Sequence, residues 1–167
     1  MATDAEANKR RAALAALELV PSGVTIGIGT GSTVNLFIDA LAANPGRVRS
    51  AVSSSQASTA RLRAAGLAVV ELNELPDLAL YVDGADEATP ARHLIKGGGG
   101  ALTREKILAA AAQRFVCIID DTKLVTTLGR FPLPIEVIPM ARTLVAMGMT
   151  SIGNGKRPSV EIGRAHV

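Results

Sequence analysis

Three carboxylates within five residues form the first place where this sequence could do chemistry. Asp83, Asp86 and Glu87 come directly after residues 78–82, an apolar run that indicates a buried strand. Open α/β sheets place their ligands at the ends of such strands. The cluster therefore predicts a polar site at a strand end, although a solvated loop or a site for a divalent cation would also suit these side chains.

A glycine tract between charged residues is the second candidate. Lys96 precedes four glycines at 97–100, and Glu105 follows in or near the first turn of a predicted helix. Consecutive glycines lose much backbone entropy on folding, so a reason is expected, such as amides that approach an anion closely. The helix dipole favours the ionised form of Glu105. A flexible linker would also be glycine-rich, but a strand and a well-formed helix would not flank it.

The segment GIGTGST at residues 27–33 is a third candidate, for binding an anion. A strand, a Gly/Thr/Ser turn and a helix follow one another here, which exposes backbone N–H groups at the positive end of the helix. A dinucleotide-binding fingerprint would need a third glycine in place of Ser32 and an acidic residue where residues 53–55 are serines. No Gly-Lys-Ser/Thr sequence follows, which excludes a Walker A loop. Alone, the segment is also compatible with a plain tight turn.

Together the three segments favour proton transfer next to a carbonyl. An aldose–ketose isomerisation needs a base that moves a proton between C2 and C1, and fixed donors that stabilise the enediolate oxygen. Two anion-binding loops, a carboxylate and a lysine supply that set. The reaction needs no redox cofactor, and the sequence indicates none.

The elements that must position these segments alternate between strand and helix patterns. Predicted strands are the short apolar runs at 24–28, 51–53, 67–70, 78–82 and 115–119. Predicted helices run from the N-terminus to Pro21 and cover about 34–41, 56–65 and 103–112. This alternation predicts an α/β fold with a doubly wound, mostly parallel, Rossmann-like sheet.

The composition excludes several classes of protein. A scattered net charge of +3 with 2% aromatic residues is typical of a solvated surface, and it offers nucleic acid little to stack on. The single cysteine, Cys117, excludes an intramolecular disulfide and a clustered-thiol zinc site. The sequence has no apolar run of membrane-spanning length and no signal-peptide pattern. We therefore expect a cytoplasmic protein with no nucleic-acid or membrane partner.

Five segments resemble ribose-5-phosphate isomerase A in order and spacing: GTGST (29–33), SSSQAST (53–59), YVDGADE (81–87), IKGGGGALTREK (95–106) and FPLPIEVIPMA (131–141). The resemblance implies interconversion of D-ribose 5-phosphate and D-ribulose 5-phosphate in the non-oxidative pentose phosphate pathway. It also implies a pentose 5-phosphate as the small-molecule partner, no metal, no cofactor, and a homo-oligomer, expected to be a dimer at full length.

The resemblance also assigns roles to individual residues. Glu105 matches the general base, and Asp83, Asp86 and Lys96 are expected to act with it at the substrate. The other substrate-binding positions that it implies are Thr30, Gly31, Ser32, Thr33, Gly84, Ala85, Gly97, Gly98, Gly99 and Lys123.

The resemblance divides the chain into an α/β catalytic domain at 1–130, the start of an incomplete α+β lid domain at 131–160, and a tail at 161–167 that is unlike the family. We therefore expect a C-terminally truncated, weakly active chain. One rival is a non-catalytic sugar-phosphate sensor domain, but the stretch before Val24 is too short for its DNA-binding helices. The other is an amino-sugar phosphate deaminase or CoA transferase, which should lack the combined DGAD and KGGGG motifs.

Overall fold

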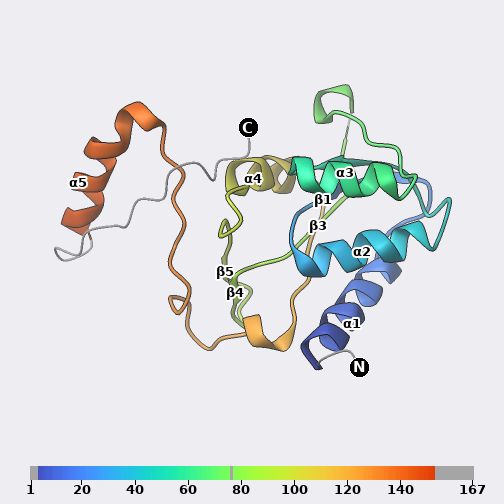
Figure 1. Cartoon of the computed structure of the whole chain (residues 1–167), viewed down its shortest axis with the longest axis horizontal. Helices are drawn as coiled ribbons and strands as arrows, with labels where there is room; N and C mark the ends of the chain where they lie inside the picture. The colour runs from blue at the N-terminus through green and yellow to red at the C-terminus, as the bar shows by residue number, and fades with distance from the viewer. Residues whose placement is uncertain (1–3, 76, 153–167) are drawn as a thin grey trace.

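A parallel sheet forms the centre of the fold (Figure 1). The structure is a computed structural model that describes residues 4–75 and 77–152. The strands of this sheet are β1 (Val24–Ile28), β2 (Val48–Ser53), β3 (Leu80–Asp83) and β6 (Phe115–Cys117). They lie in the order β2-β1-β3-β6 with all neighbours parallel, which confirms the predicted α/β class.

Helices cover both faces of this sheet. These helices are α1 (Asp4–Glu18), α2 (Ser32–Ala42), α3 (Gln56–Ala64) and α4 (Leu102–Ala111). A further helix, α5 (Arg142–Ile152), does not cover the sheet (Figure 1), and short 3₁₀ helices lie at Leu72–Glu74, Asp121–Lys123 and Pro139–Ala141. Side chains of β3 alternate between the faces. Leu80 and Val82 join a large apolar cluster with α1, α2 and α3, whereas Tyr81 packs in a smaller one with Leu108 of α4.

The strand order reverses between β1 and β3. From β1 the chain crosses to β2 on one side, and it then returns to β3 on the other side of β1. Ile28 pairs with Val82 in register, so the ends of the two central strands lie together. Ligands of open α/β sheets bind at such a reversal, beyond the carboxyl ends of the strands.

Two local predictions differ from the structure. The strand predicted at 67–70 is wrong, because only one bridge forms there, between Val69 and Ala51. A small antiparallel hairpin, β4 (Glu87–Ala88) with β5 (Leu94–Ile95), was not predicted. Each of its strands has only two residues, too few to produce an alternating pattern.

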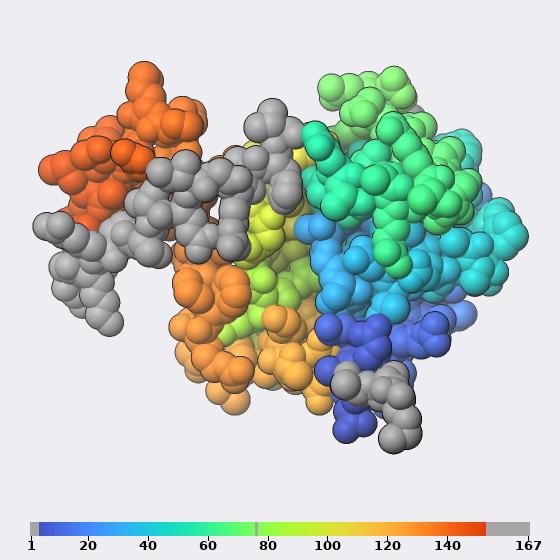
Figure 2. Space-filling model, viewed as in Figure 1, coloured from blue at the N-terminus to red at the C-terminus, as the bar shows by residue number. Residues whose placement is uncertain are grey.

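The last helix of the described chain, α5, stands apart from this α/β body (Figure 1), whereas Phe131 and Glu136 still contact it. Residues 131–138 form no regular element, and α5 lies away from the sheet and the other helices (Figures 1 and 2). The predicted tail at 161–167 lies outside the described residues, and the division near residue 130 stays a prediction. No helix within 4–75 and 77–152 has the length and apolar character needed to cross a membrane.

Candidate active site

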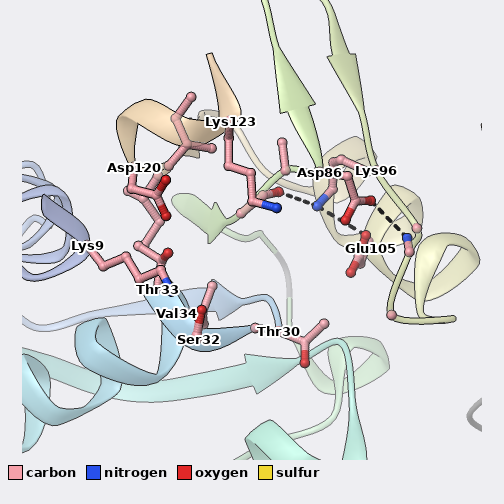
Figure 3. A pocket seen from close by; sticks show the side chains of 18 residues that line it. Lys9, Thr30, Ser32, Thr33, Val34, Asp86, Lys96, Glu105, Asp120 and Lys123 are labelled. Carbon is pink, nitrogen blue, oxygen red and sulfur yellow. Dashed lines mark hydrogen bonds and ion pairs between the residues drawn. The ribbon is translucent and has the colours of Figure 1, made fainter. Parts of the chain in front are cut away.

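A cavity of about 300 Å³ lies where the strand order reverses. Its walls come from the loops after β1 and β3, the glycine tract, the start of α4 and the segment before and within the 3₁₀ helix at Asp121–Lys123 (Figure 3). Of the predicted site residues, those that line it are Thr30, Gly31, Ser32, Thr33, Gly84, Ala85, Asp86, Lys96, Gly97, Gly98, Gly99, Glu105 and Lys123. Four separate stretches of sequence, at 30–33, 84–86, 96–105 and 123, thus meet at one place.

Asp83 lies behind the cavity wall rather than on it. Its side chain is fully buried, and its Oδ1 accepts hydrogen bonds from the backbone N–H groups of Thr30 (3.0 Å) and Gly84 (2.7 Å). Its Oδ2 lies 2.8 Å from Lys96 Nζ and accepts a hydrogen bond from the hydroxyl of Tyr81 at 2.5 Å. A buried carboxylate is tolerated only with such partners. Asp83 therefore acts on the cavity through Lys96.

Lys96 joins two carboxylates from different elements. Its Nζ lies 3.1 Å from Glu105 Oε2 on α4, and it also donates to the carbonyl oxygen of Gly84 at 2.5 Å. Burial lowers the pKa of Lys96, but the negative charges of Asp83 and Glu105 outweigh it and raise that pKa above its usual value. The side chain is therefore a fixed ammonium on the cavity wall.

Glu105 has the electrostatics of a carboxylate base. It is 4% exposed, and burial followed by the charge of Asp83 raises its pKa, while the charge of Lys96 acts in the opposite direction. The net direction is upward. A base is most effective when its pKa lies close to the working pH, so a raised carboxyl pKa suits proton abstraction.

The remaining carboxylates of the cluster point to separate partners. Asp86 Oδ2 accepts the N–H of Gly98 at 2.8 Å, and Glu87 accepts the N–H groups of Gly129 (2.8 Å) and Phe131 (2.5 Å). Asp86 thus fixes the glycine tract, and the amide of Gly98 is already used in doing so. Within residues 4–75 and 77–152, no group of three His, Cys, Asp or Glu side chains could hold a metal ion.

The end of the cavity away from Glu105 is rich in hydroxyls and lysines. Ser32 and Thr33 begin α2, and Lys123 approaches from the opposite wall (Figure 3). Sequence reasoning missed Lys9, which also lines the cavity and which the sequence places in a basic surface stretch. A hydrogen bond of 2.8 Å from Asn8 to Asp121 joins α1 to the segment that carries Lys123. Helix N-terminal amides, hydroxyls and lysines suit a phosphate.

Comparisons with known proteins identify the family of this chain. The family model for ribose 5-phosphate isomerase A (phosphoriboisomerase A) matches residues 50–160. A Bordetella pertussis protein named ribose-5-phosphate isomerase A is 59% identical over 149 residues, which cover 87% of this chain and 66% of the relative. A protein of the same name from Xylella fastidiosa is 59% identical over 148 residues, 89% of this chain and 69% of the relative.

Solved structures indicate the same family. The crystal structure of ribose 5-phosphate isomerase A from Neisseria gonorrhoeae superposes with a TM-score of 0.91 at 47% identity, covering 98% of this chain and 72% of that one. A D-ribose-5-phosphate isomerase in complex with phospho-erythronic acid gives a TM-score of 0.85 at 35% identity, with 91% and 68% covered. The chain spans about two thirds of the length of these proteins, 66% for the Bordetella relative. It belongs to the ribose 5-phosphate isomerase A family.

Proposed function

We propose that the protein interconverts D-ribose 5-phosphate and D-ribulose 5-phosphate through an enediolate. One observation carries the proposal: Glu105, a buried carboxylate with a raised pKa, faces a cavity whose other end suits a phosphate. Lys96 lies beside Glu105 on the wall (Figure 3). The relative solved with phospho-erythronic acid supports a phosphorylated ligand.

The proposed reaction moves one proton between neighbouring carbons. Glu105 takes the proton from C2 of the open-chain aldose, and the electron pair of that C–H bond forms the C1=C2 double bond of the enediolate. Negative charge develops on O1, where the ammonium of Lys96 stabilises it. A proton passes from O2 to O1, Glu105 returns its proton to C1, and the carbonyl is then at C2. Asp83 holds the ammonium, and Asp86 holds the glycine tract beside the sugar.

An isomerase assay on ribose 5-phosphate tests the proposal directly. Two proteins are compared: the 167-residue chain, and a chimera in which the Bordetella pertussis relative supplies everything after residue 160, where the family match ends. We expect turnover in the chimera and weaker turnover in the chain, which spans 66% of that relative. A folded chimera that binds ribose 5-phosphate without converting it would favour the sensor alternative.

Ser32→Ala is expected to weaken substrate binding and spare the chemical step. Ser32 lies at the start of α2 and lines the cavity away from Glu105, so its hydroxyl should contact the 5-phosphate. A hydrogen bond to a charged group contributes about 1.5–3 kcal/mol, so KM should rise about tenfold or more with kcat within about twofold. Ser151→Ala, on exposed α5, is the control. A lower kcat at unchanged KM would assign the loop to the chemistry instead.

We also propose that the full-length protein is a cytoplasmic homodimer. The dimer is supported by apolar side chains that are exposed among the described residues 4–75 and 77–152: Leu133 (65% exposed), Ile138 (73%), Met140 (95%), Leu144 (75%) and Met147 (69%). Exposed apolar surface of this extent marks an interaction site. Light scattering on the chimera should give twice the mass of one chain, and the mass of a single chain would contradict the dimer.

A further inference from the structure

Tyr81 is a buried polar side chain that the proposed mechanism leaves without a role. It lies two positions before Asp83 on β3, so both side chains are on the same face of the sheet. The hydroxyl of Tyr81 donates a hydrogen bond to Asp83 Oδ2 at 2.5 Å, and both residues are 0% exposed. Lys96 Nζ lies 2.8 Å from the same oxygen. The phenol and the ammonium therefore share one carboxylate oxygen.

The packing around Tyr81 leaves its ring one position. The ring stacks on Phe115 of β6 with centroids 5.4 Å apart and planes 25° apart. On the neighbouring strand β1, a Cβ at Gly27 would lie 2.7 Å from Cδ2 of the tyrosine ring, so the glycine makes the room that the ring occupies. Close-packed neighbours of this kind hold a side chain in one rotamer. The direction of the hydroxyl is thus set by the sheet.

The charge state of the phenol is equally fixed. Burial, and then the charge of Asp83, raises the pKa of Tyr81 far above its ordinary value. The hydroxyl therefore stays protonated throughout the range in which an enzyme works, and it remains a donor to Asp83. A neutral donor of this kind offsets part of the negative charge on Asp83 Oδ2. Because it carries no charge itself, it does not repel the ammonium of Lys96 that binds the same oxygen.

We propose that Tyr81 is a positioning residue for the isomerisation. Its hydroxyl occupies one side of Asp83 Oδ2, so that the ammonium of Lys96 is shared between Asp83 and Glu105 instead of being drawn to Asp83 alone. Without the hydroxyl, the negative charge on Oδ2 is less compensated and attracts Lys96 more strongly. The pair between Lys96 and Glu105, 3.1 Å long here, then weakens. This inference rests on the function proposed above.

The titratable groups around Glu105 determine how the loss of the Tyr81 hydroxyl should change the pH dependence of kcat/KM. The groups that face this arrangement are Asp83, Asp86, Lys96, Tyr81 and Cys117. The two aspartates raise the pKa of Glu105 and Lys96 lowers it. Because the base must be ionised, kcat/KM falls as the pH drops through this pKa. Loss of the phenol weakens the Lys96 contact and uncovers charge on Asp83, so both effects move this acid limb to higher pH.

Tyr81→Phe is the variant that tests the proposal, because it keeps the ring and removes only the hydroxyl. The variant is measured both in the 167-residue chain and in the chimera. We expect its kcat to fall about tenfold while KM changes by no more than about twofold. The acid limb of kcat/KM should move to higher pH. Thr25→Val is the matched control. It removes another buried hydroxyl of the sheet, which bonds Ser50 Oγ at 2.8 Å without touching the site. It should lower the melting temperature and leave kcat and the acid limb unchanged.

A second measurement needs neither turnover nor a variant. Tyr81 is the only tyrosine of the 167-residue chain, so ultraviolet titration of phenolate reports on this residue alone. We expect no phenolate signal until the chain unfolds at alkaline pH. Phenolate formation at an ordinary tyrosine pKa in the folded chain would overturn the proposal, whatever the enzyme does. A Tyr81→Phe protein with wild-type kcat and acid limb would overturn it too, whereas an inactive wild-type chimera would instead refute the proposed function.

Discussion

Glu105→Gln should lower kcat by about 10²–10⁴-fold and leave substrate binding largely intact. The amide has the shape of the carboxylate and can still place an oxygen beside the ammonium of Lys96, which lies 3.1 Å from Glu105 Oε2, but it cannot take a proton from C2. The variant should also be no less stable than the wild type. Burial raises the pKa of Glu105, which means that the ionised form is disfavoured in the folded protein, and the amide removes that cost.

Steady-state kinetics, ligand-binding titration and thermal melts on the chimera separate these effects. Glu74→Gln makes the same chemical change on an exposed side chain of the 3₁₀ helix at Leu72–Glu74, remote from the cavity, and should change none of the three quantities. Near-normal turnover in Glu105→Gln would remove Glu105 from the role of base. A collapse of binding together with turnover would mean that the carboxylate holds the substrate rather than reacting with it.

The parts of the site that could be predicted from sequence are those whose structural role follows from the residue types within one short segment. The four glycines before α4 indicated close backbone approach, and in the structure Asp86 binds the N–H of Gly98. A Cβ at Gly98 would lie 2.7 Å from Asp86 Oδ1. The position of Asp83 and Asp86 at a strand end followed from a general property of open α/β sheets, whose ligands bind beyond the carboxyl ends of the strands.

The parts that could not be predicted depend on contacts between distant segments. Lys9 lies among basic residues on α1, a pattern typical of a solvated helix face, and only the packing of α1 near Asp121 brings it to the cavity. Glu87 looked like a third site carboxylate, but it holds the backbone of residues more than forty positions away, Gly129 and Phe131. Tyr81 lies in an apolar strand pattern, so the sequence could not show whether its hydroxyl has a role at the site or whether its ring only packs in the core.

Gly29→Ala is expected to disable the site because the added methyl group would overlap the side chain of Asp83, which packs directly against the backbone of Gly29. Gly29 follows β1, and the backbone N–H of Thr30, its neighbour, binds Asp83 Oδ1 at 3.0 Å. A Cβ at position 29 would lie 1.8 Å from Oδ1 and 2.5 Å from Cβ of Asp83, so Asp83 or the strand end has to move. Lys96 depends on Asp83 for its place. Overpacking costs about 1–3 kcal/mol of stability, and a displacement near 1 Å at a site costs about 10²-fold in turnover.

Thermal melts and kinetics on the chimera check both effects, with Gly148→Ala as the control because an added Cβ there meets nothing within 4 Å. That variant should keep wild-type turnover. The decisive comparison repeats Gly29→Ala in an Asp83→Gly background, where the opposing side chain is gone. If Gly29 acts by making room for Asp83, the two losses in turnover will be far from additive, and the double variant will be little worse than Asp83→Gly alone. Additive losses would mean that the glycine serves the loop at 30–33 instead, independently of the carboxylate behind it.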